Sequence, residues 1–388
     1  MDEVVVRGAA DDAEEGAVLD LLPRVMGAPR EFFAARYHHD PYGSAEHSRI
    51  VLSGGEIVSH VRVYRRPIRL GRGEVWTGAI GDVCTLPQYR RRGYAAMALR
   101  DAAAWMLAQG IPLCTILSGV GVYERVGWEK VPEPHFTFAA AGLRGLIVPA
   151  EVTVRRLARV GDEATMMAAY AAHAEGRSLT VVRSPPYWRH HVDMALVERA
   201  DACLLAERAG RPVAYVRCGG EAPTLSILEA PYIRGEAGAC AVLADALGRL
   251  AAKRGITAFK GYLPPDHPWV AMGACVAAST EHLLVKVLDL PAVLAAGLEG
   301  TVPAAGAVAW VVRCGGQEAV VRPAGEQWSV DGGDPAGAGA TVLECSQAAL
   351  MRVLFRQVAP SVAWGGEWAW LDEGMVAPAP VYWRTDGV

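Results

Sequence analysis

The pattern of apolar and polar positions in the first third of the chain predicts a mixed order of strands and helices. Alternating apolar residues favour strands at 4–7, 47–52, 57–64, 67–70 and 75–80. A helix is expected at 12–26, with Asp11 or Asp12 as its cap. An apolar strand at 82–86, an alanine-rich helix at 94–109 and a strand at 113–117 follow. This order predicts an antiparallel meander that leads into a strand–loop–helix–strand crossover.

The loop between this last strand pattern and the alanine-rich helix carries the most informative residues. It reads Pro-Gln-Tyr-Arg-Arg-Arg-Gly-Tyr-Ala over residues 87–95. Backbone N–H groups at a helix N-terminus are unpaired and attract anions, and neighbouring arginines add charge and planar donors. The loop matches neither the GxxxxGK[ST] phosphate loop nor the GxGxxG dinucleotide fingerprint. It predicts an anion cradle of another kind.

A weak internal repeat divides the rest of the chain. Residues 49–60 are echoed by 203–215, and residues 99–117 by 243–261. The second copy's loop, 231–238, lacks the arginine run and contains Glu236, so we expect it to bind no coenzyme. After residue 290 Gly, Ala and Val dominate, which indicates an α+β third domain. The predicted domains are 1–148, 149–290 and 291–388.

Composition narrows the class of protein. The 388 residues are 52% hydrophobic and 21% charged, with a net charge of −4, so nothing indicates nucleic-acid binding. Eight scattered cysteines without metal spacing suggest reduced thiols. The N-terminus lacks an apolar signal core, and no apolar run is long enough to span a membrane. We therefore expect a cytoplasmic protein.

Three further features are weighed by residue type. His38 and His39 would point to opposite faces of a strand, so no metal is expected; a substrate-cleft role for Tyr37, Asp40 and Tyr42 is the alternative. Trp364, Trp368 and Trp370 suggest core or interface. The pairs Arg65–Arg66 and His190–His191 are expected to lie on the solvent-exposed surface.

Two motifs resemble a known superfamily. Arg90-x-x-Gly93-x-Ala95, between a strand and a helix, resembles the acetyl-coenzyme A pyrophosphate loop of the GNAT N-acetyltransferases. Residues 123–128, Tyr-Glu-Arg-Val-Gly-Trp, resemble that superfamily's Tyr-x-Arg-x-Gly-aromatic motif. The whole order resembles the enhanced intracellular survival protein family. That resemblance implies an α+β fold class with an active GNAT domain, a degenerate second GNAT domain and a sterol-carrier-protein-like third domain.

The resemblance also implies the site. The positions that match coenzyme-binding ones are Val83, Cys84, Thr85, Arg91, Arg92, Gly93, Tyr94, Ala95, Ala96, Ser118 and Gly119. Arg90 either flanks the phosphates or is structural. Many members have glutamate where this chain has Gly119, so any role of that side chain is absent here.

Tyr123 and Val388 match the family's catalytic groups. Tyrosine, with a pKa of about 10, is protonated at neutral pH and could protonate a departing thiolate with a pKa of about 8.5; a core tyrosine is the alternative. In the family the C-terminal carboxylate, here that of Val388, serves as general base. Valine in place of the usual aromatic residue departs from the family, and a disordered tail is the alternative.

The implied function is acetyl-coenzyme A-dependent N-acetyl transfer in a ternary complex, without a metal. The implied acceptors are small polycationic amines such as aminoglycosides, or a lysine side chain. The resemblance also implies a homo-oligomer, with a hexamer as one arrangement. The alternative function is a coenzyme A-binding or lipid-binding protein whose transferase activity has lapsed.

Overall fold

The computed structural model describes residues 3–132, 135–158, 161–193, 200–273, 275–277, 282–303, 307–332, 341–364, 368, 371–372 and 375. The chain forms two compact units. Among the described residues, the N-terminal unit takes its members from Met1–Pro132 and Thr280–Ala377, and the second unit from Glu133–Ser279. Both units combine helices with mixed sheets, which confirms the predicted α+β class.

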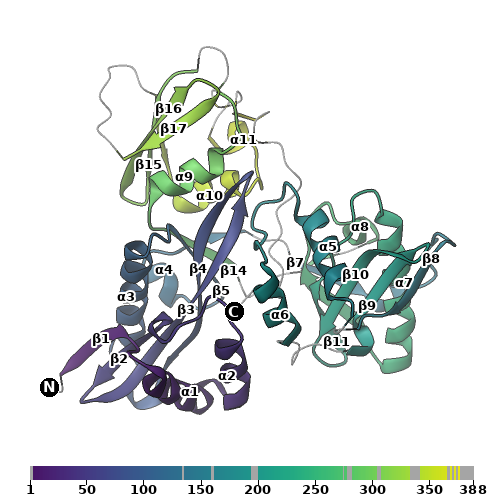
Figure 1. The fold of residues 1–388 in the computed structure, drawn as a ribbon, viewed down its shortest axis with the longest axis horizontal. Coiled ribbons are helices and arrows are strands. Elements are labelled where there is room, and N and C mark those ends of the chain that lie inside the picture. The colour runs from purple at the N-terminus through teal and green to yellow at the C-terminus, as the bar shows by residue number, and fades with distance from the viewer. Residues whose placement is uncertain are drawn as a thin grey trace. The chain divides into compact units, whose positions relative to one another are not determined.

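A mixed sheet with helices on its two faces forms the centre of the N-terminal unit (Figure 1). Its strands, in spatial order, are β1 (Val4–Gly8), β2 (Ser48–Ser53), β3 (Glu56–Leu70), β4 (Gly73–Thr85), β5 (Leu113–Ser118), β14 (His282–Val287) and β6 (Glu129–Val131). Its helices are α1 (Asp12–Met26), α2 (Arg30–His38), α3 (Tyr94–Ala108) and α4 (Val122–Arg125). The parallel pair β4 and β5, joined through α3, is the predicted crossover.

Local sequence explains most of these elements. Asp11 caps α1 by accepting the Glu14 N–H at 2.9 Å, and Gly27, with φ +78°, ends that helix. Helix α3 lies directly on β4 at Gly78, where an added Cβ would stand 2.0 Å from the Met106 sulfur. The predicted meander, crossover and cap of this region are confirmed. The strands predicted separately at 57–64 and 67–70 form one strand, β3, and those at 75–80 and 82–86 form β4.

Two local predictions are wrong. His38 ends helix α2 and His39 follows it, so neither lies on a strand. Arg66 is buried, not solvated, and donates to Asp40 at 2.8 and 3.0 Å. Asp40 therefore faces an interior cation and not an open substrate cleft. A strand of alternating residues cannot reveal this pairing, because its partner comes from a separate helix–loop segment.

A β-bulge in β4 separates that strand from β5. Between the pairs His60↔Cys84 and Arg62↔Gly81, one residue of β3 faces two of β4, and Asp82 takes φ +49°. Upstream of the bulge β4 pairs with β5 over 77–79, and downstream it does not pair with β5. A wedge opens between the two strands as a result.

Buried polar contacts hold the bulge in place. The Asp82 carboxylate accepts the Tyr64 hydroxyl at 2.6 Å and an Arg36 N–H at 3.2 Å. The His60 ring lies 3.0 Å from the Asp82 carbonyl. Because a left-handed conformation is unfavourable for a residue with a Cβ, these contacts are needed to stabilise it.

A smaller α+β layer completes the N-terminal unit. Its sheet has the order β17 (Gln327–Asp331), β16 (Gln317–Ala324), β15 (Trp310–Cys314), β18 (Thr341–Cys345), beside α9 (Leu290–Leu298), α10 (Gln347–Leu354) and α11 (Pro360–Trp364). Glu129 of β6 accepts the Ala348 N–H at the start of α10. Trp364 and Trp368 contact the buried Trp310, as expected of core residues, whereas Trp370 lies outside the described residues.

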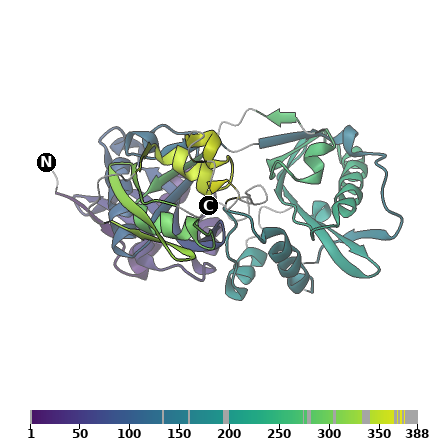
Figure 2. The same ribbon diagram turned by 90° about the horizontal axis from the view of Figure 1, so that it is seen from above.

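The second unit repeats the crossover. Its sheet has the order β13 (Cys275–Ala277), β7 (His135–Ala139), β12 (Ala258–Tyr262), β11 (Thr224–Glu229), β10 (Arg211–Gly219), β9 (Leu204–Arg208), β8 (Val152–Arg156). The helices are α5 (Glu163–Ala174), α6 (Pro185–Asp193), α7 (Ala237–Arg254) and α8 (Pro268–Ala271). Strands β11 and β12 are parallel and joined through α7. Figure 2 shows this unit, in teal and green, from a second direction. The side chains of the pair at 190–191 are not described.

The limits of the two units differ from the predicted boundaries at 148 and 290. Strand β7, upstream of 148, pairs with β12 in the second sheet. Strand β14, upstream of 290, lies between β5 and β6 in the first sheet. A strand pattern shows that a segment is extended, but it does not show which sheet the segment joins.

The bulge contacts yield a stability prediction. Asp82→Ala should destabilise the N-terminal unit by about 3–5 kcal/mol, because it leaves the buried Arg36 guanidinium without its carboxylate. Asp20→Ala, which removes an exposed ion pair with Arg30, should cost about 0–1 kcal/mol. Urea unfolding followed by circular dichroism measures both. Equal losses in the two variants would contradict this role of Asp82.

Candidate active site

The loop between β4 and α3 forms a backbone cradle. After a short 3₁₀ turn at Pro87–Tyr89, Arg91 and Gly93 take left-handed φ angles of +62° and +83°. Gly93 is the N-cap of α3 and supplies no capping side chain, so the N–H groups of the helix's first turn are open to a ligand. Such a cradle at the positive end of a helix dipole suits a diphosphate.

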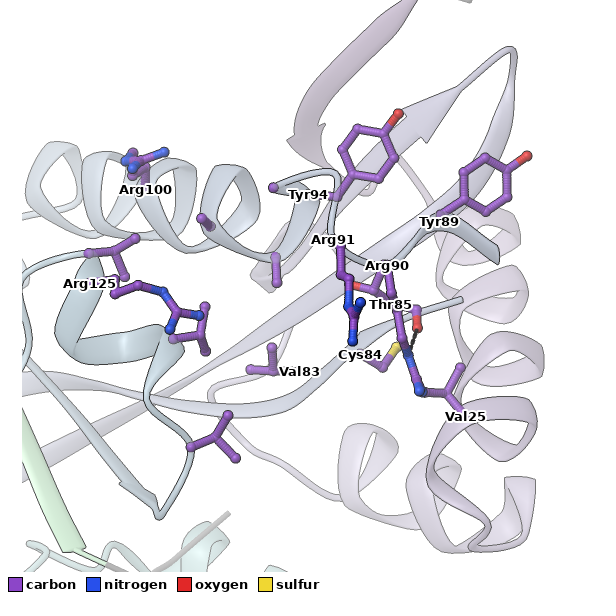
Figure 3. Close-up of a pocket in the computed structure, with 16 residues that line it drawn as sticks. Val25, Val83, Cys84, Thr85, Tyr89, Arg90, Arg91, Tyr94, Arg100 and Arg125 are labelled. Carbon is purple, nitrogen blue, oxygen red and sulfur yellow. Dashed lines mark hydrogen bonds between the residues drawn. The ribbon is translucent and has the colours of Figure 1, made fainter. Parts of the chain in front are cut away.

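A pocket of about 890 Å³ lies at this cradle (Figure 3). It is bounded by the wedge end of β4, the loop, the first two turns of α3, and α4. The residues that line it are Val25, Val83, Cys84, Thr85, Tyr89, Arg90, Arg91, Gly93, Tyr94, Ala95, Ala96, Arg100, Val120, Val122, Arg125 and Val126. Its volume and its partly apolar wall suit an extended cofactor-sized ligand.

The backbone of β4 turns two residues toward the wedge. The Cys84 carbonyl accepts the Ser59 hydroxyl at 2.8 Å and so faces β3. Because strand residues alternate, the polar backbone groups of Val83 and Thr85 face the other side, where β5 has separated. Arg90 contacts the Thr85 carbonyl at 3.3 Å. Burial raises the pKa of the Cys84 thiol to about 12, so this side chain is no nucleophile at neutral pH.

The charge of the pocket is strongly positive. Arg90, Arg91, Arg100 and Arg125 line it, and none of the described residues in its wall is acidic. Within the described part of the chain, none of the four forms an ion pair with a carboxylate. All four side chains are exposed to solvent. Four like charges around one pocket give it a positive potential, which favours an anionic ligand.

Tyr123 lies beside the pocket and not in its wall. Its side chain is 6% exposed, while the neighbouring Val122 and Val126 line the pocket. Burial raises the pKa of Tyr123, and a hydrogen bond with Ser118 acts in the opposite direction. The hydroxyl is therefore protonated at neutral pH. Ser118 also accepts the Val120 N–H at 3.1 Å.

The structure brings most of the predicted site together. Val83, Cys84, Thr85, Arg91, Gly93, Tyr94, Ala95 and Ala96 line the pocket. Arg92 points instead along the loop, contacting the Gln88 carbonyl and the Tyr89 ring. Ser118, Gly119 and Tyr123 adjoin the lining residues without belonging to them. Val388 lies outside the described residues.

Sequence reasoning missed several residues. Val25 of α1 and Arg100 of α3 line the pocket, and so does Arg125, which stands inside the quoted motif. Arg100 follows the predicted site residue Ala96 by four positions, so both lie on the same face of the helix. This spacing is the sequence signal that could have identified Arg100. Lys286 of β14 donates to the Val126 carbonyl at 2.6 Å and lies over the Trp128 ring. No local pattern could link Lys286 to this motif, because β14 is distant in sequence.

The corresponding region of the second unit is closed. Strands β11 and β12 pair over 224–227 and 258–261, almost to their ends. The His267 ring lies 2.9 Å from the Ala230 carbonyl just beyond β11. Glu236 is the N-cap of α7 and bonds to Arg208 at 2.9 Å. A carboxylate at this helix N-terminus is unfavourable for an anion, and the absence of a coenzyme from this copy stays a prediction.

The comparisons with known proteins identify the class. The family model for the acetyltransferase (GNAT) domain matches residues 6–131. The N-terminal unit thus contains an acetyltransferase domain of the GNAT type, the class that the two sequence motifs predict. Among curated proteins, no sequence matches this chain.

Solved structures share the fold over nearly the whole chain. A GCN5-related N-acetyltransferase from Kribbella flavida is 21% identical, with a TM-score of 0.70, and covers 98% of this chain and 97% of its own. One from Anabaena variabilis is 12% identical, with a TM-score of 0.74 and full coverage of both chains. Eis1 from Mycobacterium abscessus is 14% identical, with a TM-score of 0.65, and covers 98% of this chain and 99% of its own. Such identities establish a common fold and not a common substrate.

The described residues contain no group of three or more histidine, cysteine, aspartate or glutamate side chains placed to hold a metal ion. No helix among them is long and apolar enough to cross a membrane.

Gly93 offers a test of the cradle. An added Cβ at Gly93 meets no atom within 4 Å, so Gly93→Ala changes only the backbone preference, at a cost of about 1–2 kcal/mol. We expect weaker coenzyme A binding, measured by calorimetry, because the loop N–H groups lose their left-handed arrangement. Gly110→Ala, at the other end of α3, is equally open and has φ +67°. It should cost similar stability and leave binding unchanged; equal binding losses would contradict the cradle.

Proposed function

We propose that this protein transfers an acetyl group from acetyl-coenzyme A to a primary amine, with the coenzyme in the pocket at the N-terminus of α3. The single observation that carries the proposal is the pocket's charge, four arginines and no carboxylate, beside a wedge that exposes strand backbone. Coenzyme A has a diphosphate, a further phosphate and a thin pantetheine arm. This combination suits a basic cradle that continues into a narrow wedge.

The residues of the wedge have defined roles in this proposal. Bound acetyl-coenzyme A supplies the acetyl group as a thioester. Backbone groups of Val83 and Thr85 would orient the pantetheine and the thioester. The amine nitrogen would form a bond to the carbonyl carbon and lose a proton to a base, for which the family resemblance predicts the Val388 carboxylate. The carbon–sulfur bond would then break. Tyr123, kept protonated by burial, would give its hydroxyl proton to the departing sulfur. The protonated Cys84 gives no support to a covalent acetyl-enzyme.

The acceptor is proposed from resemblance and charge. A positive pocket repels cationic amines, so the acceptor would bind outside its basic walls and meet the thioester only at the wedge. A small polycation of the aminoglycoside type is the proposed acceptor, and a lysine side chain is the alternative. The Val388 carboxylate as general base, a homo-oligomer and a sterol-carrier-like third domain stay predictions of the family resemblance.

One observation favours a second candidate. Tyr123 is 6% exposed, belongs to the core and does not line the pocket. A protein that binds coenzyme A without transferring its acetyl group would show the same pocket and a purely structural Tyr123. The two candidates differ in turnover and not in coenzyme affinity.

Thiol release separates these candidates. Acetyl-coenzyme A is incubated with the protein and with polyamines, aminoglycosides or lysine peptides, and free thiol is followed with a chromogenic disulfide. Release that depends on one amine class supports transfer and identifies the acceptor. Tight coenzyme binding without release from any amine would establish the second candidate.

Tyr123→Phe tests the acid role. Without the proton donor kcat should fall about 100-fold or more, while coenzyme A affinity should change little, because the ring still fills its core position. Tyr262→Phe, a buried tyrosine of the second unit, is the control and should retain full turnover. Unchanged kcat in Tyr123→Phe would assign the proton to another group.

A further inference from the structure

The four arginines of the pocket form two separate pairs. Arg90 and Arg91 belong to the loop before α3, whereas Arg100 belongs to α3 and Arg125 to α4. Figure 3 shows the first pair at one side of the pocket and the second pair at the other. A ligand that used only the helix N-terminus would leave the second pair without an anion.

Arg100 and Arg125 face a common space. Arg100 follows Ala96 by four residues on α3, so both project from the same face of the helix, and Ala96 lines the pocket. Arg125 reaches the same pocket from α4. Neither forms a salt bridge with any described residue, although Lys130 and Glu124 pair close by.

A third cation adds to the charge there. Burial lowers the pKa of Lys286, and the charge of Arg100 lowers it further. Arg100 therefore stands in a positive field that no carboxylate of the pocket wall offsets. An anion at this end of the pocket would relieve the repulsion between these like charges.

The second pair lies beyond the reach of one diphosphate. Arg100 follows Tyr94 by six positions, which is about 9 Å along the helix axis. The diphosphate of coenzyme A at the first turn of α3 would occupy the N–H groups there and the Arg90–Arg91 side. Coenzyme A carries one more phosphate, the 3′-phosphate of its ribose, which bears close to two charges at neutral pH.

We propose that Arg100 and Arg125 bind the 3′-phosphate of coenzyme A, so that this enzyme discriminates coenzyme A from its 3′-dephospho form. The inference rests on the proposed function only for the identity of the ligand. Guanidinium groups are suited to such a phosphate because they donate parallel hydrogen bonds to two of its oxygens.

Calorimetry with two ligands tests the proposal. The intact protein should bind coenzyme A about 10-fold to 100-fold more tightly than 3′-dephospho-coenzyme A. Arg100→Ala and Arg125→Ala should each lose much of this preference while binding the dephospho form as the intact protein does. Unchanged binding of the dephospho form also shows that each variant is folded. Arg24→Ala, an exposed arginine of α1 outside the pocket wall, matches the charge change and should keep the full preference.

Several results would overturn the proposal. Equal affinity of the intact protein for the two ligands would show that nothing recognises the 3′-phosphate. A variant that weakens both ligands equally would place its arginine on another part of the coenzyme. If the protein bound neither coenzyme A nor its 3′-dephospho form, the pocket would not be a coenzyme A site. Binding with the stated preference but without acetyl transfer would leave this inference standing and defeat only the proposed function.

Discussion

The bulge at Asp82 is the constraint on which the N-terminal unit depends. One extra residue in β4 ends its pairing with β5 and turns the backbone of Val83 and Thr85 toward open space. The left-handed φ of Asp82 is unfavourable by itself and is held by Tyr64, Arg36 and His60. Burying these polar groups is tolerable because each meets a partner. The shape of the pocket therefore depends on a buried polar network whose residues do not line the pocket.

The two crossovers show how small changes decide whether such a fold binds a ligand. Both units join parallel strands through a helix, and both carry a register shift in the strand before that helix. In the second unit the strands stay paired nearly to their ends, His267 approaches the Ala230 carbonyl, and Glu236 occupies the helix N-terminus. The N-terminal unit places Gly93 and arginines at the corresponding position. A carboxylate in place of a glycine at the N-cap repels an anion that the helix dipole would otherwise attract.

The sequence predictions were correct where a feature depends on residues close together in the sequence, and they failed where it depends on distant ones. The arginine loop, the Asp11 cap and the strand order depend on near neighbours, and the structure reproduces them. Arg66 was assigned to the surface because its acid partner, Asp40, belongs to another element. The sequence did not identify Arg100 and Arg125 as site residues, because the pocket wall that they line forms only when the chain folds.

The sequence by itself determined the class of fold, the crossover and the glycine–arginine loop at the N-terminus of α3, because periodicity, caps and loop residues act within a few residues of one another. Only the tertiary structure decided that β14 inserts between β5 and β6, that the wedge opens at Asp82, and that four arginines line one pocket with no carboxylate among its described lining residues. The pairing of strands and the charge of a pocket both depend on residues that are far apart in the sequence. The free energy of burying and pairing such residues is set by the folded chain, and a local sequence pattern does not contain this information.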